Sequence, residues 1–73
     1  DAIKYVNDIQ TNPVMQNVQI ISQKRTFSNK GNEITISLVG EPLTSEQVAI
    51  LQKRMEEMGL KNTKLTIRQA GGA

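Results

Sequence analysis

The stretch best suited to binding a ligand is GEPLTSEQVAIL, residues 40–51, where a glycine-containing loop leads into a helical pattern. Such a loop can bind phosphate, because the free backbone N–H groups at a helix N-terminus attract anions. Here only one glycine is present, and Pro42 has no N–H to donate. Glu41 and Glu46 would also repel a phosphate. The stretch therefore favours a helix start over an anion site.

The same residues form a complete set of helix-start signals. Thr44 stands at the N-cap position and Gln47 follows three residues later, which is the spacing of a capping box. Leu43 and Val48 stand at the positions of a hydrophobic staple, which fixes the angle at which the chain enters the helix. We therefore interpret residues 40–51 as a strand end, a stiff corner and a capped helix.

The remaining residues offer little catalytic chemistry. The chain has no cysteine and no histidine, so the usual members of metal sites and of nucleophile–base pairs are missing. Only serine, threonine, lysine and carboxylates remain as candidates, and they form no catalytic pattern. The sequence predicts a protein that is not an enzyme and has no catalytic residues, cofactor or metal.

Hydrophobic spacing predicts the elements that position these residues. Apolar residues recur at helical spacing near the N-terminus and again after Thr44, and they alternate in three other segments. Gly31 suits a hairpin turn and Gly59 suits a helix stop. The predicted order is helix, strand, strand, helix, strand, over residues 1–10, 17–27, 33–40, 45–58 and 63–69.

This order predicts an α+β fold, a two-layer αββαβ sandwich with a three-stranded sheet and both helices on one face. We expect residues 1–70 to form a single domain and residues 71–73 to form a flexible tail. Whether the last strand lies beside the second or the first strand stays open at this point. If it lies parallel to the second strand, the connection through the helix should be right-handed.

A candidate interaction face follows from the alternation of the strands. If Ile34, Ile36 and Leu38 face the helices, then Val39 points to the open face of the sheet. Ile21 and Phe27 are out of phase with the inward residues, unless a bulge intervenes before Phe27. We predict an interaction or self-association face on the open side of the sheet, formed by Ile21, Phe27, Val39, Thr66 and Arg68.

The charges argue against a nucleic-acid partner. Nine basic and seven acidic residues give a net charge of +2, and they are mixed along the chain. Lys64 and Arg68 would lie near Lys24 or Arg25 if the first and third strands adjoin. An RNA-binding sheet needs stacking aromatic residues, however, and Tyr5 is one of only two aromatic residues in this chain.

Residues 34–69 resemble part of a known family. ISLVGEP, the helix after it and GLKNTKLTIRQ look like the soluble segment of bacterial multi-pass membrane proteins, the domain of unknown function numbered three-eight-nine. The resemblance implies a soluble extramembrane module that mediates protein interaction, assembly or regulation of its parent membrane protein. The domain would occupy an aqueous compartment on one side of the bacterial cell membrane. The chain starts at Asp1, so we expect a processed or excised piece.

A looser resemblance is to BON domains, which are small bacterial envelope modules with the same order of elements. LVGEPLTSEQ would correspond to their strand-to-helix step and NTKLTIR to their last strand, although GLKNTK replaces their usual glycine–valine step. This resemblance implies the alternative of a free-standing envelope domain that binds phospholipid.

The helix start at Thr44 yields a first prediction. Thr44→Ala is expected to lower the free energy of unfolding by ~1 kcal/mol, because an N-cap hydroxyl accepts a hydrogen bond from a backbone N–H that the helix leaves unpaired. Thermal denaturation measures the loss. An unchanged melting temperature would contradict the cap.

Overall fold

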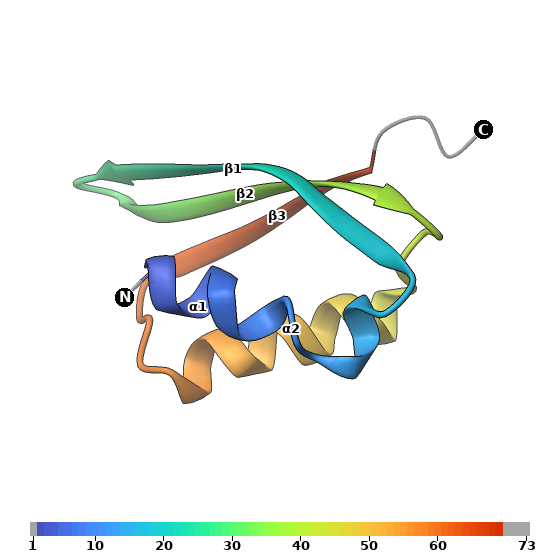
Figure 1. The fold of residues 1–73 in the computed structure, drawn as a ribbon. Helices are drawn as coiled ribbons and strands as arrows, with labels where there is room; N and C mark the ends of the chain where they lie inside the picture. The colour runs from blue at the N-terminus through green and yellow to red at the C-terminus, as the bar shows by residue number, and fades with distance from the viewer. Residues whose placement is uncertain (1, 70–73) are drawn as a thin grey trace.

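The computed structural model describes residues 2–69 and confirms the predicted order of elements (Figure 1). The tail predicted at residues 71–73 lies outside the described residues. A short 3-10 helix, which the spacing of apolar residues did not predict, follows the first helix and begins at Pro13. The elements are α1 (Ala2–Ile9), the 3-10 helix (Pro13–Met15), β1 (Val18–Ser28), β2 (Gly31–Gly40), α2 (Ser45–Glu57) and β3 (Thr63–Gln69).

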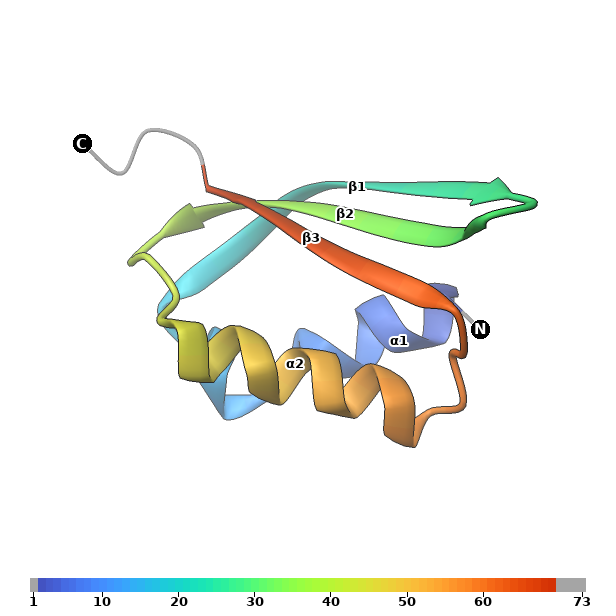
Figure 2. The same cartoon turned by 180° about the vertical axis from the view of Figure 1, so that it is seen from behind.

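The sheet has the strand order β1-β2-β3, which settles the position of the last strand. β2 pairs with β1 in the antiparallel direction and with β3 in the parallel direction. The chain passes from β2 through α2 to the parallel β3, a connection that is right-handed in nearly all proteins. Figures 1 and 2 together show this hand and place both helices on one side of the sheet.

The core lies between the sheet and the helices, and β2 contributes most to it from the sheet. Ile34, Ile36 and Leu38 alternate along β2 and are buried, as their spacing predicts. The other buried side chains come from α1, the 3-10 helix, α2 and β3: Tyr5, Val6, Ile9, Met15, Leu51, Met55 and Leu65. The core is thus aliphatic apart from one tyrosine and two methionines.

Both ends of α2 are capped as the sequence predicts. The Gln47 amide donates to Thr44 Oγ1 at 3.1 Å, and the Thr44 amide donates to Gln47 Oε1 at 2.9 Å, which completes the capping box. At the other end Gly59 has φ +80°, a left-handed conformation that glycine adopts without strain. The Leu60 amide then donates to the carbonyl of Met55 at 3.2 Å.

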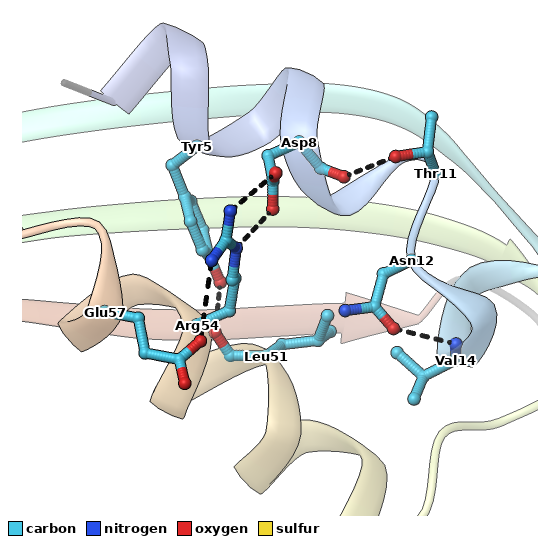
Figure 3. Close-up of polar contacts among 8 residues, drawn as sticks. All are labelled: Tyr5, Asp8, Thr11, Asn12, Val14, Leu51, Arg54 and Glu57. Atoms are coloured by element: carbon cyan, nitrogen blue, oxygen red, sulfur yellow. Dashed lines mark hydrogen bonds and ion pairs between the residues drawn. The ribbon is translucent and has the colours of Figure 1, made fainter.

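Two polar contacts join α1 to α2 (Figure 3). The buried Tyr5 hydroxyl donates to the Leu51 carbonyl at 2.7 Å. On the rim of the same contact Arg54 donates from Nε and Nη2 to the two carboxylate oxygens of Asp8, at 2.7 and 2.9 Å. These hydrogen bonds hold the pKa of Asp8 below its ordinary value. Arg54 also lies 3.5 Å from Glu57.

The Tyr5 hydroxyl yields a second prediction. Burial, with a smaller contribution from the Asp8 charge, raises the pKa of Tyr5 from 10.0 to about 12. The folded state therefore keeps its proton where the unfolded chain loses it, and stability falls between pH 10 and about 12. Relative to Tyr5→Phe, the wild type should be about 1 kcal/mol more stable at neutral pH. Across the alkaline range the wild type should then lose roughly 2 kcal/mol relative to Tyr5→Phe, so that Tyr5→Phe becomes the more stable protein.

Urea denaturation of both proteins from neutral to alkaline pH measures this difference. Tyr5→Phe serves as the matched control, because it keeps every other alkaline titration of the chain. If the free energy of unfolding changed equally with pH in the two proteins, the result would contradict a buried, protonated Tyr5 hydroxyl.

Candidate functional site: the open face of the sheet

One face of the sheet is left uncovered by the described residues, because both helices pack on the opposite face (Figures 1 and 2). The side chains of β2 that alternate with its buried residues must point to this uncovered side. They are Glu33, Thr35, Ser37 and Val39, and all four are partly exposed. We call the uncovered side the open face.

The strand register extends the open face across all three strands. Paired residues of neighbouring strands point to the same face of a sheet. The open face therefore contains rows that run from β1 through β2 to β3. These rows are Ser22, Ser37 and Arg68; Lys24, Thr35 and Thr66; and Thr26, Glu33 and Lys64.

A β-bulge in β1 changes the composition of this face. The register shifts between Ile20 and Ser22, so Ile21 is an extra residue with no partner in β2. Strict alternation along β1 would assign each side chain to one face of the sheet. From Ser22 onward, the bulge places each side chain on the opposite face. Phe27 pairs with Asn32 and lies on the helix side of the sheet, two residues from Arg25.

The candidate face predicted from the sequence is therefore partly wrong. Phe27 does not share a face with Val39, because the bulge at Ile21 reverses the direction of its side chain. Ile21 and Phe27 are nevertheless 54% and 68% exposed, as the prediction required. Ile21 lies at the bulge on the edge strand, away from the centre of the face.

The other three predicted residues lie on the open face. Val39 pairs with Gln19, Thr66 lies beside Thr35, and Arg68 lies beside Ser37. They come from β2 and β3, which are neighbours in the sheet. β1 and β3 do not adjoin, so Lys64 and Arg68 are separated from the β1 cations by the width of β2.

The fold separates charges that are mixed along the chain. Within the described residues the strands carry four cations, Lys24, Arg25, Lys64 and Arg68, and a single carboxylate, Glu33. The other described acidic residues lie on the helices or in the β2–α2 loop: Asp8, Glu41, Glu46, Glu56 and Glu57. The sequence did contain a signal for this separation, because Lys64, Thr66 and Arg68 recur at the period of one strand face.

The single carboxylate of the open face has a partner on the same face. Thr66 Oγ1 donates to Glu33 Oε2 at 2.6 Å, from the neighbouring parallel strand. Glu33 also stands beside Lys64 in the register. The remaining cations of the face, Lys24 and Arg68, have no carboxylate beside them in their rows, so the face keeps a net positive charge.

The spacing of the three cations limits what the open face can bind. Lys64 and Arg68 are four residues apart on one strand, roughly 13 Å. Lys24 lies two strands away, roughly 10 Å from β3. These separations are too large for one phosphate to contact all three cations, whereas several carboxylates on an extended surface can do so. Thr35 and Ser37, between the cations, carry small hydroxyl side chains that can form hydrogen bonds.

No other feature of residues 2–69 forms a better site. A hollow of about 800 Å³ at the hairpin end contains Lys30, Lys61 and Lys64, but Glu33 and Glu56 line it too and oppose an anion. These residues contain no cluster of three acidic, histidine or cysteine side chains that could hold a metal. None of the helices described is long and apolar enough to cross a membrane.

Comparisons with protein families, with curated proteins and with solved structures found no match to this chain. The resemblances to the family numbered three-eight-nine and to BON domains therefore stay predictions from the sequence.

The charge of the open face yields a third prediction. Two copies stacked through this face would bring three cations against three others, with one carboxylate on each side, so self-association is expected to be disfavoured at low ionic strength. Sedimentation velocity in low salt should show a monomer. A dimer in low salt that Arg68→Glu disrupts would place the contact on the open face and contradict the expected repulsion.

Proposed function

We propose that this domain is a non-enzymatic interaction module, the extramembrane part of a bacterial membrane protein, and that its open face binds an acidic surface of a protein partner. The observation that supports the proposal is the collection of Lys24, Lys64 and Arg68 on an uncovered sheet face. An acidic partner gains three spaced charge pairs there. The hydroxyl groups of Thr35 and Ser37, between the cations, can bond to its polar atoms.

A phospholipid surface is the second candidate, because the same cations would attract anionic headgroups. The composition of the face favours protein over lipid. Val39, which pairs with Gln19, is the only large apolar side chain that the described strands place on the open face, and Ile21 lies at its edge. Peripheral membrane binding usually adds buried apolar area to the charge attraction, and this face offers little of it.

Site-specific photo-crosslinking tests the proposal in a bacterial extract. A crosslinking amino acid is placed at Ser37 on the open face or, as a control, at the exposed Gln52 on α2. We expect a defined protein adduct from position 37 and none from position 52. Polyglutamate should compete with its formation, because the binding depends on carboxylates.

Charge-reversed variants make the test specific for the open face. Lys64→Glu with Arg68→Glu should abolish the adduct. Lys53→Glu with Lys61→Glu changes the net charge equally, at exposed positions outside the open face, and should preserve it. Equal loss in both double variants would contradict docking through the open face. Co-sedimentation with phosphatidylglycerol vesicles that depends on Lys64 and Arg68, without any protein adduct, would replace the proposal with the lipid alternative.

A further inference from the structure

β1 is an edge strand with a long exposed margin. Within residues 2–69 its only neighbour in the sheet is β2, and it runs for 11 residues. Every side chain from Ile21 to Ser28 is exposed. In an antiparallel ladder alternate residues point their N–H and C=O groups away from the partner strand, so β1 offers a row of backbone groups to another strand.

The hairpin half of β1 is also uncovered on the side that faces the helices. Gln23, Arg25 and Phe27 share this side with buried residues of β2, yet all three are exposed. An apolar notch of about 200 Å³ lies next to Phe27. Its lining residues come from α1, the hairpin and the segment around the start of β3: Ala2, Arg25, Phe27, Asn32, Ile34, Leu60 and Thr63.

We propose that an acidic, extended segment of a partner protein adds to the edge of β1 as a fourth strand. Its backbone pairs with residues 22–28, and one apolar side chain enters the notch beside Phe27. Two consecutive acidic residues meet Lys24 and Arg25. This inference goes beyond docking on the open face. It shares Lys24 with that face, but it also uses the backbone edge of β1 and the helix side of the sheet, where Arg25 and Phe27 lie.

The charges of β1 determine the occupant. Lys24 and Arg25 are adjacent, so their side chains lie on opposite faces of the sheet, and an added strand meets them with two consecutive residues of its own. β1 itself contains no acidic residue. Edge cations and a bulge are devices that discourage a second identical strand, and β1 has both. The charge of an acidic segment is therefore complementary to the charge of this edge. The charge of a second copy of β1 is not.

The notch specifies one further residue of the segment. Arg25 and Phe27 lie on the same face, two residues apart, so the side chain opposite Phe27 is two positions from the carboxylate opposite Arg25. Phe27, 68% exposed, and the buried Ile34 offer apolar contact there. In a segment that pairs antiparallel to β1, the expected pattern is an apolar residue, any residue and then two acidic residues. In a segment that pairs parallel to β1, the same pattern runs in reverse order.

Nuclear magnetic resonance with a synthetic peptide tests strand addition. The probe alternates valine and threonine and has two consecutive glutamates at its centre. We expect shift changes in β1 and slower hydrogen exchange for alternate β1 amides, because those N–H groups gain partners. The same peptide with N-methylated backbone nitrogens should not bind. A matched peptide with lysines in place of the glutamates should bind about tenfold more weakly or worse.

Protein variants locate the site. Arg25→Glu should weaken binding about tenfold, since a favourable cross-strand pair becomes a repulsive one. Phe27→Ser should weaken it as well, and both positions are exposed, which favours retention of the fold. Arg68→Glu makes the same charge change on the open face and should leave peptide binding unchanged. It should still weaken docking through the open face, so the two proposals fail separately.

Two results would overturn the inference. Binding of the N-methylated peptide with unchanged affinity would show charge attraction without strand pairing. Shift changes confined to β2 and β3 would place the acidic peptide on the open face instead of at the β1 edge.

Discussion

The structure depends on the burial of one face of β2 against the two helices. Ile34, Ile36 and Leu38 supply most of the sheet side of the core, and among the described strands β2 alone has a neighbour on both sides. Burial of an aliphatic side chain contributes roughly 1.5–3 kcal/mol, so these three residues fix which face of the sheet the helices cover. Every alternate side chain of β2 must then face away from the helices. The open face is therefore a direct consequence of the core.

The contact between the helices strengthens this arrangement and also affects the charge distribution. Tyr5 bonds to the Leu51 carbonyl inside the core, and Arg54 holds Asp8 in a bidentate pair at the rim. These contacts use the Asp8 carboxylate within the helical layer. The α2 carboxylates Glu46, Glu56 and Glu57 belong to the same layer. The strands keep their cations with Glu33 as their only described carboxylate, and the sheet becomes the basic layer.

The bulge at Ile21 shows how one residue redirects a surface. Strict alternation places Phe27 on the open face, and the register shift moves it to the helix side, beyond the cover of the helices. An apolar open face thereby becomes a basic, hydroxyl-rich one, and the exposed aromatic ring moves to the notch beside Arg25. A bulge leaves little trace in composition, because it depends on how two strands align rather than on the preference of either strand.

The sequence by itself determined the order of the elements, the capped start of α2 at Thr44 and its stop at Gly59, because these features depend on contacts within a few residues. It also determined the inward residues of β2 by their alternation. Only the tertiary structure decided that β3 lies beside β2, that β1 carries a bulge, and that Lys24, Lys64 and Arg68 share one face. Those features depend on pairing between segments that are distant in the chain, and local preference does not specify such pairing.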